Sequence, residues 1–375
     1  MRAVHVTTRH RALDVRIFEK ECRSLAAAGH EVHLVAPDVP GPERDGVRLH
    51  GLPPERAGAS RPARIAARLR AAGARVRALA PDLVHFHDPE LLPLALRWKA
   101  GGLRVVYDVH EDTPREARTV LPPGSWRRAV YPAVWSALEA AAKATLDGFV
   151  CATPAIADHF PATRRVLARN FPRLGEFEGA ALPDAAAFAA RPPRLVYVGG
   201  LTEKRGLREM LRAAALLPDA LGCRLVLVGE PTPPDLPWRS WPGAERALAL
   251  GWQDRAGVLA ALSQARVGLV LLHPTPEYRE SWPVKLFEYM AAGLPVIASD
   301  FALWRSFVDG AGCGFLVDPL DPQAIARAAE RLLRDPAEAA AMGARGWRAA
   351  RERYSWEAEA KALLGLYERL GALGR

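Results

Sequence analysis

The sequence predicts an α/β protein built from two doubly wound domains, and three observations lead to this prediction. Short runs of β-branched residues alternate with Ala-, Arg- and Leu-rich stretches of helical period, as expected of βαβ units with parallel strands. A second series of the same kind starts near residue 194. Between the two series lies a segment rich in Pro, Ala and Gly that keeps no steady period. The 375 residues suffice for two domains of ordinary size.

The elements follow in order from this pattern. In the first series, strands are expected at 2–7, 31–36, 83–87, 103–108 and 147–151, and helices at 15–28, 61–79, 89–99 and 126–145. In the second series, strands are expected at 194–198, 223–228, 266–272, 294–298 and 313–317. Because helices separate the strands, each half should form one mainly parallel sheet.

These elements divide the chain into domains. We expect an N-terminal domain over 1–170, a linker over 171–193 and a C-terminal domain over 194–354. The last helix, 355–375, has no strand after it and is expected to pack back on the N-terminal domain. Two such domains that face each other bind ligands at the carboxyl ends of their strands. Functional residues should therefore follow directly after strands.

Composition narrows the classes of function. The chain has 51 basic and 42 acidic residues, and its net charge of +9 suits an anionic ligand, a membrane surface or nucleic acid. It contains no basic stripe interleaved with aromatic residues, which disfavours nucleic acid. Its four cysteines form no CxxC pair, which fits a reducing compartment. No apolar run reaches the roughly 18 residues of a membrane span, so a cytoplasmic protein is expected.

The strongest motif is ESWPVKLFEYMAAGLPVIASD, residues 280–300, in which seven residues separate Glu280 from Glu288. Its predicted helix start is a potential phosphate site, because backbone amides and the helix dipole favour anions there. That start comprises Trp282, Pro283, Val284 and Lys285. Glu280 can reach polar groups beyond the phosphate, and Glu288 can accept paired hydroxyls such as those of a ribose. The spacing alone leaves open that both glutamates merely flank an ordinary turn.

A second phosphate-facing motif is VGGLTEKRGL, residues 198–207, where a glycine turn follows a strand and precedes a helix. It comprises Gly199, Gly200, Lys204 and Arg205. It is neither GxGxxG nor a Walker loop, so neither a dinucleotide nor ATP is the expected ligand. A guanidinium at Arg205 can clamp a diphosphate through two hydrogen bonds. Lys204 fits either a phosphate ligand or a solvated surface residue.

Histidines follow two strands of the first half. His110 lies just past the strand in YDVHEDTP, whereas His85 and His87 share one strand face in HFHDPE. An HxH pair at a strand end can bind a metal ion, so a metal-dependent hydrolase that uses His85 and His87 is an alternative. The sequence contains no D-x-D motif, which weakens that alternative.

Taken together, these segments resemble the retaining, nucleotide-sugar-dependent glycosyltransferases of family 4 with their E-x7-E motif. That family has the GT-B fold, in which two Rossmann-like domains face each other across a cleft. The resemblance extends over nearly the whole chain. It is carried by DVRIFEKECRSLAAAGHEVHLVAPD, PDLVHFHDPELLPLAL, VVYDVHEDTP, VYVGGLTEKRGLREML and GLPVIASD, in the family's order.

The resemblance implies roles for these residues. Glu280 should contact the donor sugar, Glu288 the nucleotide ribose, and Arg205 the diphosphate. The family usually has an arginine where this chain has Gly200, so Lys204 and Lys285 are candidates to supply the missing charge. His110 is implied as a catalytic residue that contacts the donor sugar. The family counterpart of Trp252 lies against the base, although a tryptophan in the core is equally compatible with the sequence.

The first loop departs from the family. It has TTRHRALDVR, residues 7–16, where the family commonly has a glycine-rich loop near the donor phosphate. Arg9 and Arg16 either supply charge to that phosphate or bind the acceptor. Asp88 and Glu90 are interpreted as part of an acceptor-side loop.

One helix carries a basic face. Arginines at positions 61, 64, 68 and 75 lie beside an apolar stripe. This Arg61–Arg75 face could rest on anionic lipid at the inner side of a membrane, or its arginines could simply be solvated on a helix packed against the sheet.

The resulting prediction is a glycosyltransferase that moves a sugar from a UDP- or GDP-linked donor to a hydroxyl of a glycan or lipid-linked acceptor. Retention of configuration, no metal cofactor, and a place in polysaccharide or glycolipid assembly are expected from the resemblance. The alternatives are the metal-dependent hydrolase and a non-catalytic relative that binds sugar nucleotides. The Glu280/Glu288 pair argues against the non-catalytic relative, whereas the glycine at position 200 keeps it open.

Overall fold

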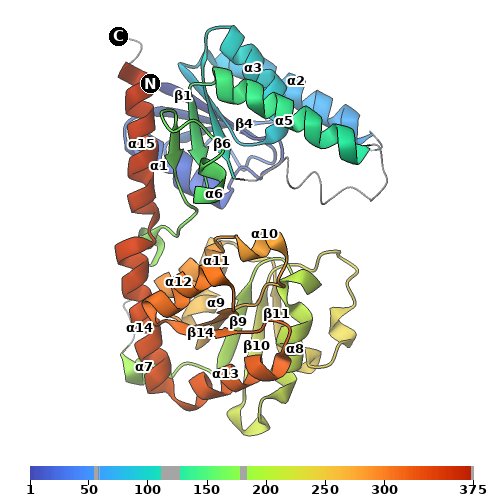
Figure 1. Cartoon of the computed structure of the whole chain (residues 1–375), viewed down its shortest axis with the longest axis vertical. Coiled ribbons are helices and arrows are strands. Elements are labelled where there is room, and N and C mark those ends of the chain that lie inside the picture. Colours follow the sequence, from blue (N-terminus) through green and yellow to red (C-terminus); the bar gives the residue numbers. More distant parts are fainter. Residues whose placement is uncertain (55–57, 59, 111–126, 178–183, 373–375) are drawn as a thin grey trace. The chain divides into compact units, whose positions relative to one another are not determined.

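The computed structural model describes residues 1–54, 58, 60–110, 127–177 and 184–372. The chain forms two compact units. The first unit comprises Met1–Asn170 and Trp356–Arg375, and the second comprises Phe171–Ser355. Each unit has a mainly parallel sheet with helices on both faces (Figure 1), which confirms the predicted α/β class.

The sheet of the first unit has the strand order β3-β4-β2-β1-β5-β6-β7-β8, and only the β3/β4 pair is antiparallel. The bounds are β1 (Arg2–Val6), β2 (Glu31–Ala36), β3 (Glu43–Arg44), β4 (Val47–Gly51), β5 (Leu83–Phe86), β6 (Arg104–Val109), β7 (Gly148–Cys151) and β8 (Arg165–Leu167). Strands β3, β4 and β8 were not predicted, because short strands near a sheet edge lack a continuous apolar run.

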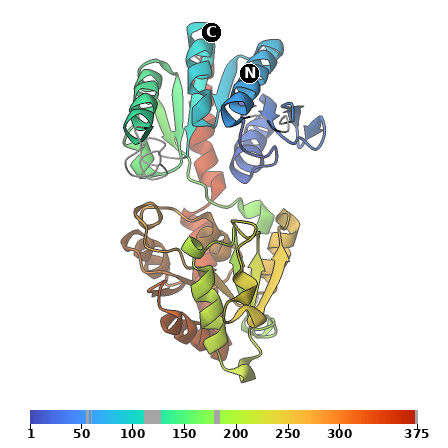
Figure 2. The same ribbon diagram turned by 90° about the vertical axis from the view of Figure 1, so that its right-hand side faces the viewer.

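Helical segments cover both faces of this sheet, and each face has its own core. The π-helical segment η1 (Val15–Cys22), α1 (Arg23–Ala27) and α15 (Trp356–Ala372) pack on one face, around Phe18, Trp356 and Leu363. The other face carries α2 (Arg61–Leu79), α3 (Leu92–Ala100) and α5 (Arg127–Thr145). The C-terminal helix α15, red in Figure 2, therefore completes the first unit.

The sheet of the second unit is entirely parallel, with the order β11-β10-β9-β12-β13-β14. The bounds are β9 (Arg194–Val198), β10 (Arg224–Val228), β11 (Ala247–Gly251), β12 (Val267–Val270), β13 (Val296–Ser299) and β14 (Gly314–Val317). The helices around this sheet are α8 (Leu207–Leu216), α9 (Arg255–Ser263), α10 (Pro276–Arg279), α11 (Val284–Ala291), α12 (Ala302–Ala311), α13 (Pro322–Arg334) and α14 (Pro336–Arg353).

The range predicted as a linker, 171–193, contributes to the second unit where it is described. It contains a 3₁₀ turn, Leu174–Phe177, and the short helix α7 (Ala185–Ala189), which packs against α14. Phe171, Phe177 and Phe188 are all buried in the core of this unit. Three phenylalanines spaced without period give no helix or strand signal, yet their burial binds the segment to the unit. None of the described helices is both long and apolar enough to cross a lipid bilayer.

Candidate functional site

Two glycine turns meet at the carboxyl ends of strands β9 and β10 in the second unit. Gly199 follows β9 with φ of 136°, and Gly229 follows β10 with φ of 140°. A Cβ atom on Gly229 would overlap the carbonyl oxygen of Gly199, so the two backbones touch directly. Only glycine combines this conformation with this approach.

Two cationic side chains converge on this turn. A Cβ atom on Gly199 would lie 2.8 Å from Lys285 Nζ and 3.6 Å from Arg205 Nη1. At Gly200 it would lie 3.3 Å from the same Arg205 nitrogen. The guanidinium of Arg205 thus lies beside Gly200, the position where the resemblance implies an arginine. The hydroxyl of Thr202 accepts a hydrogen bond from the amide of Arg205 at 3.2 Å and shapes the turn that carries it.

Lys285 holds a buried ammonium group over an aromatic ring. Its Nζ lies 3.8 Å from the centroid of Tyr197, and among the described residues it has no hydrogen-bond partner. Burial, and then the charge of Arg205, hold the pKa of Lys285 well below its ordinary value, while Glu288 acts in the opposite direction. Tyr197 in turn donates its hydroxyl to the carbonyl of Gly200 at 3.0 Å. This site therefore favours an anion beside the glycine turn.

Helix α11 is placed by its own buried face. The hydroxyl of Tyr289 accepts a hydrogen bond from the amide of Val198 at 2.9 Å, and its ring fills the space that a side chain on Gly268 would need. Pro283 precedes the helix and Val284 begins it, as the sequence predicts. The Trp282 ring packs against Phe307, with ring centroids 4.7 Å apart. Glu280 ends α10 with an exposed side chain.

Glu288 lies on the buried part of α11 and is held by an arginine that sequence reasoning missed. Arg255 Nη1 donates to Glu288 Oε1 at 2.6 Å, and the same guanidinium donates to Glu176 Oε2 at 2.6 Å. Arg255 is the first residue of α9 and directly follows the N-cap residue Asp254. The loop that leads into this helix carries Trp252. The one sequence feature that pointed to Arg255 is its place in the LGWQDR segment, close to Trp252. Nothing in the sequence indicates that Arg255 pairs with a distant glutamate.

Trp252 is 61% exposed, which excludes the alternative of a core tryptophan. Its amide donates to Glu230 Oε1 at 2.9 Å and so links the loops that follow β10 and β11. An open pocket of about 460 Å³ lies at these strand ends, lined by Gly229, Glu230 and Gly251 among others. Lys204 is exposed.

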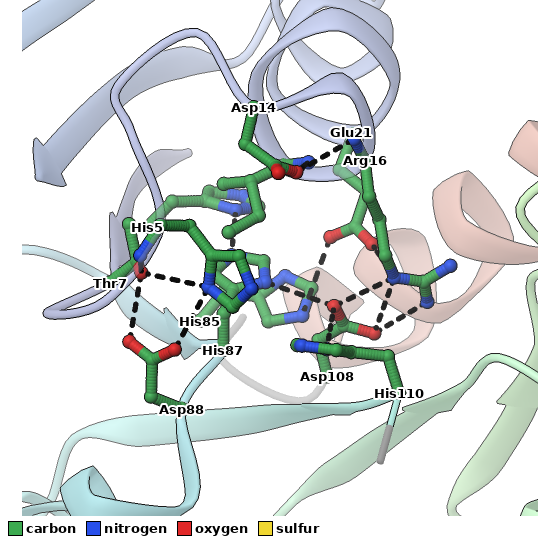
Figure 3. A network of polar contacts seen from close by, with 12 residues as sticks. His5, Thr7, Asp14, Arg16, Glu21, His85, His87, Asp88, Asp108 and His110 are labelled. Carbon is green, nitrogen blue, oxygen red and sulfur yellow. Dashed lines mark hydrogen bonds and ion pairs between the residues drawn. The ribbon is translucent and has the colours of Figure 1, made fainter. Parts of the chain in front are cut away.

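In the first unit, strand register gathers histidines and acids on one face of the sheet. His5 on β1 pairs in register with His85 on β5, and His87 follows that strand beside Asp108 on β6. Figure 3 shows Asp108 as the centre of the resulting network. Arg16 Nε and Nη2 donate to both carboxylate oxygens of Asp108, and its Nη1 donates to the carbonyl of Ala168 at 2.9 Å.

The prediction that Arg16 offers its charge to a phosphate or an acceptor is therefore wrong. Its side chain is 6% exposed, and every nitrogen of the guanidinium is engaged within the unit. The side chain of Asp14 accepts hydrogen bonds from the amides of Arg16 and Ile17, so η1 begins there and directs Arg16 inward. Arg9, by contrast, follows β1 with an exposed side chain.

His110 is the other histidine held by Asp108. Its Nδ1 lies 3.2 Å from Asp108 Oδ2, which also accepts from His87 Nδ1 at 3.0 Å. The His110 side chain is 16% exposed, at the end of β6 where the sequence placed it. Neighbouring residues 111–126, including Glu111 and Asp112, lie outside the described part of the chain.

Two buried groups of side chains have the composition of a metal site: His5, Glu21 and His85, and Glu21, His87 and Asp108. In each group the ligand atoms lie within 4.8 Å of one another. However, both nitrogens of His5 and both of His87 already take part in hydrogen bonds inside the network. Among the ligand atoms of these two groups, His85 Nε2 and the Glu21 oxygens lack a hydrogen-bond partner within the described residues. The HxH pair thus lies inside the unit as part of a hydrogen-bonded core.

The loop after β1 is organised by Asp88. This buried carboxylate accepts hydrogen bonds from the Thr7 hydroxyl and the Thr8 amide and lies 2.9 Å from His10 Nδ1. Burial raises its pKa, but these partners, His10 first, outweigh that effect and lower it to about 2. Glu90, half-buried, accepts from the Thr8 hydroxyl at 3.0 Å. Asp88 therefore supports the loop from within and does not face an acceptor.

The basic face of α2 is also partly committed to this loop. Arg68 donates to the carbonyl of Thr8 at 2.6 Å. The side chain of Arg61 lies outside the described part. Arg68 thus supports the loop after β1. From the sequence alone, the basic face of this helix was expected to be either lipid-bound or solvated.

Comparison with known proteins gives matches along most of the chain. Residues 16–170 match the family model described as Glycosyltransferase Family 4, and residues 192–335 match the one described as Glycosyl transferases group 1. The phosphatidyl-myo-inositol mannosyltransferase of Mycobacterium leprae is 31% identical over 198 residues, which cover 51% of this chain and 50% of that protein. The chain spans about half the length of the curated relatives it matches.

Solved structures show the same fold. Sucrose-phosphate synthase from Thermosynechococcus elongatus superposes with a TM-score of 0.73 at 22% identity, covering 100% of both chains. HepE from Anabaena, solved in complex with UDP-glucose, gives a TM-score of 0.70 at 14% identity over 99% of this chain and 100% of that one.

Proposed function

The chain belongs to the GT-B glycosyltransferases of the family 4 type, and we propose that it transfers a sugar from a nucleoside diphosphate sugar to a hydroxyl acceptor. The observation that carries the proposal is Lys285, a buried ammonium group that lacks a hydrogen-bond partner among the described residues. It lies beside a glycine turn that Arg205 also approaches. Two cations against a side-chain-free backbone suit a diphosphate.

In this proposal the second unit binds the donor. Arg205, Lys285 and the first-turn amides of α11 neutralise the diphosphate, and Glu288 accepts the ribose hydroxyls while Arg255 holds it in place. The base is assigned to the pocket beside the loop of Trp252. UDP is the first candidate nucleotide, because HepE was solved with UDP-glucose.

The chemistry follows from charge. The bond between the anomeric carbon and the diphosphate breaks, and the same cations that bind the diphosphate stabilise its growing negative charge. The acceptor oxygen bonds to the anomeric carbon while its proton passes to the departing phosphate oxygen on the same face, so the configuration is retained. The proposed roles of Glu280 and His110 are to contact the donor sugar. The protein groups supply the positive charge, so no step requires a metal ion.

The acceptor is proposed at the level of class. A relative named for phosphatidyl-myo-inositol supports a glycan or lipid-linked acceptor, and a role in polysaccharide or glycolipid assembly, without naming the compound.

Thermal unfolding with UDP, GDP, ADP and their common sugars, each with and without chelator, tests the proposal. We expect stabilisation selective for one base and unaffected by chelator. Absence of any shift would contradict donor binding. A loss of stability on adding chelator alone would instead support the metal-dependent alternative. Stabilisation without release of the nucleotide from its sugar, for any acceptor offered, would identify a non-catalytic relative.

A further inference from the structure

Asp108 is the acceptor at the centre of the polar network on one face of the first sheet (Figure 3). It is fully buried on β6, and its two oxygens receive hydrogen bonds from Arg16, His87 and His110 (Figure 3). Burial would raise its pKa, but the charge and hydrogen bonds of Arg16, followed by the two histidines, hold that pKa well below its ordinary value. Asp108 is therefore an ionised carboxylate, which can only accept hydrogen bonds.

This state settles which histidine nitrogens carry protons. Because Asp108 can only accept, Nδ1 of His87 and Nδ1 of His110 must both donate to it. Burial lowers the pKa of His87, so its ring is neutral and its Nε2 has no proton. Nε2 of His87 therefore accepts from His5 Nδ1, which lies 3.0 Å away.

The same direction continues to the C-terminal helix. Burial also keeps His5 neutral, so with Nδ1 protonated its Nε2 must accept, and the hydroxyl of Tyr367 on α15 donates to it at 3.1 Å. Tyr367 then accepts from His85 Nδ1 at 3.0 Å. In the series His85, Tyr367, His5, His87, Asp108, each group therefore donates a hydrogen bond to the next. Reversing any one of these bonds would place two donors or two acceptors opposite each other.

The His110 side chain lies at the end of β6 and is 16% exposed, whereas the His87 side chain is fully buried. Nδ1 of His110 is bound to Asp108, and within the described residues its Nε2 has no hydrogen-bond partner. Among the described residues, the charged or titratable groups that face it are Asp108, the His87 imidazole and the His10 ring, whose centroid lies 5.2 Å away. Arg16 lies behind Asp108 and neutralises its charge.

We propose that Asp108 is a positioning residue that holds His110 with Nδ1–H inward, so that Nε2 is the atom presented to substrate as a hydrogen-bond acceptor. The catalytic consequence rests on the proposed function, whereas the assigned tautomer does not. A hydroxyl of the bound sugar would donate to Nε2. The rest of the network fixes the carboxylate, so that His110 needs no reorganisation when substrate binds.

The tautomer is tested directly in the unaltered chain by long-range ¹H–¹⁵N correlation of the histidine side chains. The spectrum is recorded at about pH 8.5, above the ordinary imidazole pKa of about 6.5. His110→Gln identifies the resonance by its loss. We expect His110 as the Nδ1–H tautomer with a bare Nε2. An Nε2–H tautomer would overturn the proposal, and because no substitution of Asp108 is involved, a misfolded variant cannot obscure the result.

A double-mutant cycle tests the role in catalysis, measured as release of UDP from UDP-glucose. Asp108→Asn should lower turnover by about 10- to 100-fold with little change in UDP affinity. In the His110→Gln background, the same change should have an effect of less than about twofold. An equally large effect in that background would show that Asp108 acts on the fold and not through His110.

Asp147→Asn is the matched control. This carboxylate also lies in the first unit, but it binds Lys99 and the amide of Val105 before β7 begins. It should leave the His110 resonance and the turnover unchanged. If the wild-type chain binds none of the nucleotides, the proposed function fails, yet the tautomer spectrum still decides whether Asp108 orients His110.

Discussion

Replacing Lys285 with methionine should make the second unit more stable and donor binding weaker. Methionine keeps most of the unbranched stem that lies against Tyr197 but removes the buried ammonium. A buried charged donor without a partner costs about 3 kcal/mol or more. The desolvated contact with the ring offsets about 2 kcal/mol of that cost. A net gain of about 1 kcal/mol corresponds to a rise in Tm of about 2–4 °C for a domain of this size.

The same substitution removes a charge-assisted contact to the diphosphate. Such a hydrogen bond contributes about 1.5–3 kcal/mol, so the Kd for UDP should rise about 10- to 100-fold. Thermal unfolding and isothermal titration calorimetry with UDP measure the two effects on the same sample. Arg327→Met provides the comparison, because the Arg327 side chain on α13 is 68% exposed in the same unit and its loss should change neither quantity appreciably.

The difference in stability between Lys285→Met and wild type should depend on pH in a defined direction. The pKa of Lys285 is lowered in the folded state, so the unfolded chain binds more protons and wild-type stability rises with pH up to the ordinary value of 10.5. The stability advantage of Lys285→Met should therefore be largest near neutral pH and narrow toward pH 10.5. A variant that is less stable than wild type and binds UDP with unchanged affinity would refute the assignment of Lys285 to the phosphate.

Two further predictions concern the glycine turn and the loop after β1. Gly199→Ala should raise the Kd for UDP by at least about tenfold, because the added Cβ would lie 2.8 Å from Lys285 Nζ and the backbone has a φ of 136°. If calorimetry shows an unchanged Kd, the turn does not approach the ligand. The pKa of Asp88 is lowered to about 2 from an ordinary 3.8, so its contribution of about 2 kcal/mol should be present above about pH 4 and lost as the pH falls toward 2. In urea titrations, Asp88→Asn should have a lower free energy of unfolding than wild type at neutral pH. Between about pH 4 and pH 2 the variant should lose less of that free energy than wild type does. An equal loss in the two proteins would contradict this prediction.

Much of the candidate donor site could be predicted from local sequence patterns. Gly199, Gly200 and Arg205 follow a strand within one short segment, and the turn and helix signals that place them depend on neighbouring residues alone. Glu288 was predicted on the same basis. Arg255 and Glu176 were not predicted, because Arg255 meets Glu288 and Glu176 across separations of 33 and 79 residues, and local patterns cannot encode such pairings.

The first unit shows what local reasoning could not decide. An HxH pair and two acids were interpreted as a possible metal site and an acceptor-side loop, since their residue types permit both. Strand register then placed His5 beside His85, and the C-terminal helix brought Tyr367 to them. Once buried, these side chains had to satisfy one another.

The sequence by itself determined the α/β class, the strands of both sheet centres and the residues of the glycine turn and the α11 start, because period, turn chemistry and helix caps act over a few neighbouring residues. Only the tertiary structure decided that Arg16 turns inward to Asp108, that Asp88 braces its loop, and that Lys285 lies without a hydrogen-bond partner among the described residues. The physical reason is burial: whether a charged side chain serves the fold or a ligand depends on which partners surround it after distant segments have packed together.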